Sequence, residues 1–312
     1  MDEPTGPNTR PEPAPPPLDV ALRGSLPCLN CGYELQGLSV RGACPECGVA
    51  VRATILHRVD PHAEAFHPLP TPTLTANAVF FWSLGGLLAV AFGWAPRLSD
   101  FYADLRGVGV APDLTWTGWA SLASLALSAL ASLGLIHATR EIGPGRIARA
   151  AAGVLFYLPL AWCWWRITQV IDLTHVAPYL DVHPNPTRLG LRVCLGAAAI
   201  GMLLLVRPNV RALVARSLVL RTGRVDRQTI FATTAAIALA MAGDTVRLIS
   251  TALPDASAPL VASAGALLVL IGSILITIAL IGATVDGWRL RASILSPGLR
   301  LSELLEVRPN GS

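Results

Sequence analysis

The sequence predicts an all-α polytopic membrane protein with six transmembrane helices and a small N-terminal β module. Three observations on its 312 residues lead to this fold class. Hydrophobic residues make up 53% of the chain and charged residues only 14%, against about 25% charged residues in typical soluble proteins. Six apolar segments follow residue 73, each close to the ~20 residues that cross a hydrocarbon core of about 30 Å. Four cysteines precede these segments at the spacing of a metal site.

The cysteine motif predicts a closed zinc site. Its pattern is C-x2-C, twelve residues, C-x2-C, formed by Cys28, Cys31, Cys44 and Cys47. Two residues between the members of a pair let both sulfurs turn onto one ion, and four thiolates bind zinc tetrahedrally. Gly32 and Gly48 follow the pairs, where a tight turn favours positive φ. Four protein ligands leave no open coordination position, so we expect a structural ion whose binding folds a small β zinc ribbon.

Iron and disulfides are the alternatives at this site. Rubredoxin-type iron sites use similar turns, but they have a longer spacer and an aromatic core, whereas Tyr33 is the only aromatic residue between Gly24 and Ala65. Disulfides need an oxidising compartment, and the orientation argued below places these cysteines in the cytosol. We therefore expect zinc, with iron as the remaining alternative.

The ribbon resembles the N-terminal head of a group of bacterial multi-pass membrane proteins. The resemblance lies in residues 28–38, CLNCGYELQGL, and residues 44–48, CPECG. Members of that group carry C-P-x-C-G-Y-x-L-x-G-L and then C-P-E-C-G before their transmembrane helices. Leu29 stands where proline is usual, which leaves the ligands unaffected. The resemblance covers about 30 of 312 residues and implies a rubredoxin-like zinc ribbon without implying an activity.

Composition divides the chain into five predicted parts. Residues 1–24 are rich in proline and read as a disordered tail. Residues 25–55 form the ribbon, and residues 56–73 are a second proline-rich stretch that suits a semi-rigid linker. Residues 74–286 form the transmembrane domain, and residues 287–312 form a cytoplasmic tail.

The six apolar segments alternate with loops of unequal basic charge. We place them at residues 74–95, 116–138, 148–172, 189–206, 229–250 and 259–284. The loop after the fourth segment holds six arginines and the C-terminal tail holds four, whereas residues 251–258 hold none. Loops rich in basic residues stay on the cytoplasmic side of a membrane. We therefore expect a protein of the cytoplasmic (inner) membrane with both termini in the cytosol.

Four ionisable residues form a candidate cluster inside the membrane. They lie near the ends of the third and fifth segments and are Arg166, Asp172, Asp244 and Arg247. Ionisable residues in a span are candidates for function. The predicted orientation puts them near the outer boundary, where arginine can also reach the headgroups, so interfacial anchoring competes with a polar cavity. Asp244 and Arg247 are spaced i, i+3 and can pair with each other on one helix face.

Two weaker patterns accompany these segments. The first, third and fifth segments each end near an arginine, a hydroxyl residue and an aspartate, which would fit three copies of a helix hairpin. The aspartates are Asp100, Asp172 and Asp244. Gly85, Ala89 and Gly93 form a stripe of small residues that favours close helix packing within the bundle.

The sequence contains none of the catalytic patterns that we sought, so we do not expect an enzyme. Residues 1–73 hold five arginines against eight acidic residues, which argues against binding of nucleic acid by the ribbon. The first hypothesis is an interaction or scaffold role, in which the ribbon binds a cytosolic protein while the helices anchor it in the lipid bilayer. The alternative is a transporter or channel-like protein that uses the Arg/Asp cluster, with a regulatory ribbon.

Overall fold

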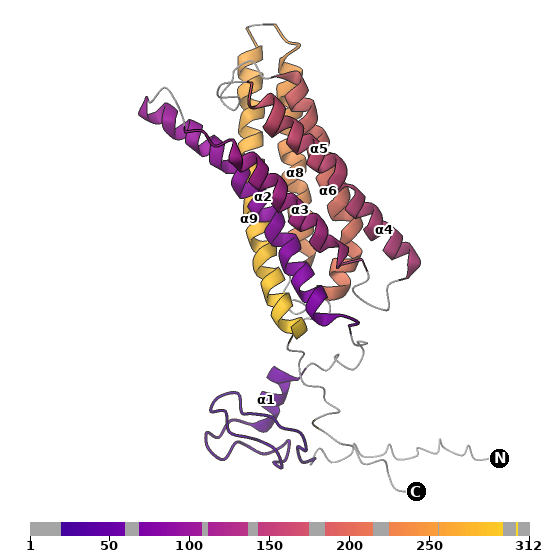
Figure 1. Ribbon diagram of the computed structural model, residues 1–312. Coiled ribbons are helices and arrows are strands. Elements are labelled where there is room, and N and C mark those ends of the chain that lie inside the picture. Colours follow the sequence, from indigo (N-terminus) through magenta and orange to yellow (C-terminus); the bar gives the residue numbers. More distant parts are fainter. Residues whose placement is uncertain are drawn as a thin grey trace, which may run out of the picture. The chain divides into compact units, whose positions relative to one another are not determined.

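The computed structural model describes residues 20–59, 69–107, 112–136, 143–174, 185–214, 225–254, 256–295 and Leu304, with side chains of 225–229 omitted. The chain divides into two compact units (Figure 1). The N-terminal unit comprises Met1–Phe66 together with Gly298–Ser312, and the helical unit comprises His67–Pro297.

The N-terminal unit packs turns around one short helix, α1 (Val51–Arg58). Its described residues form three isolated antiparallel bridges, Ala21 with Ser39, Pro27 with Glu34, and Ala43 with Ala50, and no strand. The expected β ribbon is therefore present only as bridges, because each pairing is interrupted by a turn after one residue pair. The packed core includes Leu22, so the unit begins before the predicted boundary at residue 25.

A residue from the far end of the chain completes this core. Leu304 is 1% exposed and packs with a set of apolar residues that includes Leu22, Leu26, Leu35 and Val51. The backbone N–H of Arg23 also donates to the Leu304 carbonyl at 3.0 Å. Segments about 280 residues apart in the sequence thus build one small unit.

The helical unit contains six spans that are long and apolar enough to cross a membrane, which confirms the predicted number among the described residues. They are α2 (Pro72–Arg106), α3 (Trp116–Leu133), the series Pro144–Ile171, α6 (Pro186–Val214), Ile230–Ser250 of α8 (Val225–Ser250), and α9 (Ala258–Leu295). Several exceed the predicted bounds: α2 continues to Arg106 instead of ending at residue 95, and α9 passes the predicted domain end at residue 286. At 1.5 Å per residue α2 is about 52 Å long, so part of it extends beyond a hydrocarbon core.

Neighbouring helices approach closely at small residues. The most extensive contacts are those of α8 with α9 and of α2 with α3, and α2 also packs on α9 (Figure 1). A Cβ atom on Gly85 would lie 2.7 Å from the Ser124 carbonyl oxygen, and one on Gly272 would lie 2.7 Å from the Ala240 nitrogen. The Ser121 hydroxyl donates to the Ala89 carbonyl at 2.6 Å. The predicted small-residue stripe on α2 therefore packs inside the bundle.

The third span changes its helical geometry twice. It begins as α4 (Pro144–Leu155), restarts as α5 (Tyr157–Arg166) and ends in a π-helical turn, η2 (Ile167–Ile171). Pro159 explains the first change, because it has no N–H and its ring would clash with the carbonyl of Leu155 in a continuous α-helix. In η2 the N–H of Asp172 donates to the Ile167 carbonyl at 2.8 Å, a bond to the fifth preceding residue. Such turns are frequent at functional sites.

Candidate functional site

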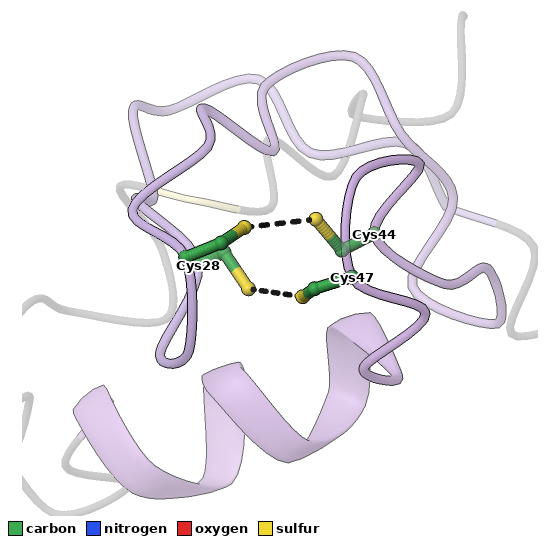
Figure 2. Close-up of side chains that lie close together, drawn as sticks. Cys28, Cys44 and Cys47 are labelled. Atoms are coloured by element: carbon green, nitrogen blue, oxygen red, sulfur yellow. Dashed lines mark hydrogen bonds between the residues drawn. The ribbon is translucent and has the colours of Figure 1, made fainter.

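The four predicted ligand cysteines converge in the N-terminal unit. Their sulfur atoms all lie within 4.8 Å of one another. The Cys28 and Cys47 sulfurs are 3.5 Å apart, as are those of Cys31 and Cys44, and Figure 2 shows these two contacts side by side. Tetrahedral metal–sulfur bonds of about 2.3 Å would place the sulfurs ~3.8 Å apart. The four thiols are free of disulfides, and the donor set fits one metal ion.

Two matching turns present the cysteine pairs. The N–H of Gly32 donates to the Cys28 carbonyl at 3.1 Å, and that of Gly48 donates to the Cys44 carbonyl at 2.9 Å. The φ angles of Gly32 and Gly48 are 75° and 71°, and a Cβ atom on either would meet nothing within 4 Å. The backbone conformation, rather than crowding, therefore requires glycine at both positions, as predicted.

The turns also polarise the sulfur atoms. Backbone N–H groups of Cys31 and Asn30 donate to the Cys28 sulfur and lower the pKa of Cys28 to about 6. At Cys31 the Tyr33 N–H acts in the same direction, but burial and the other three thiols outweigh it and raise the pKa to about 12. Adjacent thiolates repel one another, so the cluster cannot easily hold four negative charges alone. A bound cation would relieve this repulsion.

A second candidate site lies inside the helical unit. It is a cavity of about 820 Å³ between α2, α3, the α5–η2 segment, α6, α8 and α9. The charged residues that line it are Arg97, Asp100, Asp104, Asp113, Asp172, Arg188, Arg192 and Asp244. Asp104 and Asp113 are exposed, so the cavity reaches the surface where α2 ends and α3 begins. The three aspartates of the predicted hairpin pattern all line this one cavity.

Two ion pairs connect α6 to neighbouring segments, the end of η2 and α8. Arg188 binds Asp172 through Nε to Oδ1 at 2.7 Å and through Nη2 to Oδ2 at 3.2 Å. One turn further along α6, Arg192 directs Nε to both oxygens of Asp244 at 2.9 Å. The side chains are 5% and 11% exposed in the first pair, and 12% and 3% in the second. Pairing offsets part of the large cost of burying these charges.

The predicted intramembrane cluster is only partly reproduced. Asp172 and Asp244 line the cavity, whereas Arg166 and Arg247 are not among its lining residues. The prediction that Arg247 partners Asp244 overlooked Arg192, which approaches from another helix. Arg247 instead packs along α9, where a Cβ atom on Gly265 would lie 2.7 Å from its Cγ. The three cavity arginines replace the two that we had named.

Two features of the sequence could have revealed these residues. Arg188 and Arg192 are spaced i, i+4 at the start of an apolar helix, so they share one face. Asn185 caps this helix by accepting from the Arg188 N–H at 3.2 Å. The end of α2 is amphipathic. Arg97, Asp100 and Asp104 on one face line the cavity, whereas the apolar side chains of Leu98 and Phe101 are exposed. The predicted span ended too early to include this face.

Away from the charged residues, the cavity wall is mainly apolar, with hydroxyl side chains such as Ser121, Thr168 and Ser273 among the lining residues. On α6, α8 and α9 it is formed by residues that include Met202, Leu203, Ile237, Met241, Ile276 and Leu280. Two aromatic side chains, Phe92 and Trp164, line the part between α2 and α5. The tryptophans of α5 thus differ in direction: Trp162 and Trp165 are exposed, whereas Trp164 faces inward against Gly93.

No family model, curated protein or solved structure matches this chain. Fold and site alone therefore define its class. The part of the chain that the structure describes has six apolar helices that fit a multi-pass membrane protein, and it has a four-cysteine cluster that can hold a metal ion.

Proposed function

We propose that this protein is a membrane transporter whose substrate site is the charged cavity of the helical unit. The observation that carries the proposal is the convergence of eight charged side chains on one cavity that reaches the surface. Ionisable residues are costly in a membrane and commonly mark the path of a substrate. The volume of about 820 Å³ lies within the range of roughly 300–1,000 Å³ that is typical of small-molecule sites.

The depth of the cavity favours a transporter over an open channel. Its lining on α2 begins at Gly86 and its lining on α6 ends at Leu203, so the first part of α2 and the last part of α6 take no part in it. The cavity thus opens toward one end of the bundle and closes toward the other. A substrate site that faces one side at a time is the arrangement that alternating access requires.

The proposal includes zinc as the ion of the N-terminal unit. Four thiolates without an open position suit structural zinc, and iron remains the alternative. The distribution of arginines among the loops supports a location of the N-terminal unit on the cytosolic side of the inner membrane. Independent support comes from Leu304, which packs on the same unit as Leu22, because six crossings return both chain ends to one side. With both chain ends in the cytosol, the cavity mouth between the end of α2 and the start of α3 lies one crossing away and therefore faces the outside. No enzymatic activity and no nucleic-acid partner are assigned.

An interaction role for the N-terminal unit is the second candidate function. Four large apolar side chains among the described residues of this small unit, Val20, Leu29, Tyr33 and Leu56, are exposed. Such side chains suit contact with a cytosolic protein, which could anchor or regulate the transporter. Replacing Tyr33 and Leu56 by serine should remove a partner from cross-linked pull-downs while zinc content stays constant. An unchanged set of partners would argue against this role.

Cysteine accessibility tests the transporter proposal. In a Cys163→Ser, Cys194→Ser background, Ser273→Cys places a thiol in the cavity wall, and Leu270→Cys places one on the exposed face of the same helix. A membrane-impermeant thiol reagent is applied to vesicles of either orientation, and mass spectrometry quantifies labelling of the α9 peptide. We expect Ser273→Cys to react rapidly from the outside and slowly from the cytosolic side, and Leu270→Cys to resist from both. Access to Ser273→Cys from only one side, or from neither, would refute transport.

A further inference from the structure

We infer that the cavity selects lipophilic cations, that is, bulky apolar molecules carrying a delocalised positive charge. The inference rests on the proposed function, because it names the substrate class of the same site. Three properties of the wall carry it: its charge balance, the engagement of its arginines, and its apolar and aromatic surface.

The charge balance of the wall is acidic. Five aspartates line the cavity against three arginines. Arg188 and Arg192 each bind one aspartate, which leaves Asp100, Asp104 and Asp113 with Arg97 as the only further lining arginine among the described residues. Asp100 is half-buried, whereas Asp104 and Asp113 are exposed near the mouth. A cation that enters the cavity therefore meets the carboxylates of Asp104 and Asp113 first. It then reaches Asp100, whose carboxylate is partly removed from water, so that its attraction for a cation is less screened.

The arginines are poorly placed to recognise an anion. Arg188 and Arg192 already direct two contacts each at a carboxylate, at distances of 2.7 to 3.2 Å. An anionic substrate would have to displace Asp172 or Asp244, and the displaced carboxylate would remain in the bundle without its partner. Arg97 lies about one turn further from the mouth along α2 than Asp100, with its guanidinium carbon 5.8 Å from the Trp94 ring centroid. A carboxylate- or phosphate-bearing solute thus has no unengaged pair of arginines inside.

The rest of the wall suits an apolar body. Leucine and isoleucine side chains of α6, α8 and α9 contribute to this surface, and Met202 and Met241 can adapt to irregular shapes. Phe92 and Trp164 offer aromatic rings between α2 and α5. The faces of such rings attract cations within about 6 Å of the ring centre. A small hydrated ion would gain little from these contacts, whereas a large organic cation would use both parts of the wall.

Two ions of nearly equal shape and opposite charge provide the test. Binding of tetraphenylphosphonium and of tetraphenylborate to the full chain in nanodiscs is measured by equilibrium dialysis, with uptake by empty nanodiscs subtracted. We expect Kd for the phosphonium to be at least tenfold lower than Kd for the borate. Equal affinities, preference for the borate, or no binding of either ion would refute the inference.

Charge variants show whether binding occurs at this site. Asp100→Asn should weaken phosphonium binding about tenfold and leave or improve borate binding. Phe92→Leu should also weaken phosphonium binding without affecting the borate. Asp286→Asn is the matched control, because Asp286 lies on α9 outside the cavity lining, and it should bind as the parent protein does. Equal effects of Asp100→Asn and Asp286→Asn would refute the site. If the binding results contradict the inference but Ser273→Cys is labelled from both sides, only the substrate class is wrong. If Ser273→Cys is not labelled from both sides, the transporter proposal itself is wrong.

Discussion

The buried ion pair between Arg192 and Asp244 makes a quantitative prediction about the stability of the helical unit. Asp244→Asn keeps the shape of the side chain but leaves the Arg192 charge buried without its carboxylate. Two unit charges about 4 Å apart interact by ~4 kcal/mol at an effective dielectric constant of about 20. Breaking one partner of a buried pair typically costs ~3–5 kcal/mol. We therefore expect Asp244→Asn to lower the free energy of unfolding by about 3–5 kcal/mol.

A second variant separates pairing from packing. Arg192→Gln combined with Asp244→Asn removes both charges and retains polar side chains that can hydrogen-bond. Because no uncompensated charge is then buried, the double variant should recover most of the loss and lie within ~1–2 kcal/mol of the parent protein. Such a recovery would show that the loss in Asp244→Asn comes from the unpaired arginine charge rather than from packing.

Arg289 and Asp286 on α9 provide the control pair. Their closest N–O distance is 4.0 Å, and the arginine side chain is 58% exposed. An exposed pair contributes roughly 0–1 kcal/mol, so Asp286→Asn should change stability by less than ~1 kcal/mol.

Reversible unfolding in mixed detergent–SDS micelles, followed by tryptophan fluorescence, measures all four proteins. Similar losses for Asp244→Asn and Asp286→Asn, or a double variant as unstable as Asp244→Asn alone, would refute the reasoning.

Three further predictions concern packing and the metal unit. Gly272→Leu should lower the unfolding free energy by about 1–3 kcal/mol in the same assay, since its Cβ would lie 2.7 Å from the backbone of α8, whereas Gly282→Leu, with nothing within 4 Å, should be near neutral. Leu304→Asp should accelerate amide hydrogen exchange in the N-terminal unit while exchange in the bundle stays unchanged, because a charge would replace a buried side chain. Purified protein should contain about one zinc per chain, Cys31→Ser should lose most of it and Cys163→Ser should keep it, as measured by atomic emission; equal zinc content in the two variants would contradict the ligand assignment.

Much of the fold could be predicted from short-range patterns in the sequence. Hydropathy over about 20 residues located all six spans, because crossing a hydrocarbon core is a requirement on each helix separately. The ends were harder to predict: the last part of α2 is amphipathic, and a search for continuous apolar runs stops before Arg97. The β ribbon was also expected from its turns, but the segments between these turns form single bridges instead of ladders among the described residues.

The two candidate sites differ in how far the sequence could predict them. The metal cluster was predictable because the members of each cysteine pair lie within one turn and both turns share the same geometry. The cavity was only half predictable. Asp172 and Asp244 drew attention as charges in apolar segments, but their partners are 16 and 52 residues away in sequence and lie on a different helix. Nothing local in either segment specifies which arginine faces it.

Sequence alone determined that this chain has six membrane-length apolar helices and a sulfur quartet suited to a metal ion, since both depend on contacts within a helix or within a turn. The tertiary structure alone decided that five aspartates and three arginines from segments far apart in the sequence share one cavity, and that Leu304 closes the core of the N-terminal unit. These contacts arise from the packing of whole helices and chain ends, which brings together residues that no local pattern relates. Because a buried charge must find a partner, packing rather than sequence neighbourhood selected the ion pairs of the cavity.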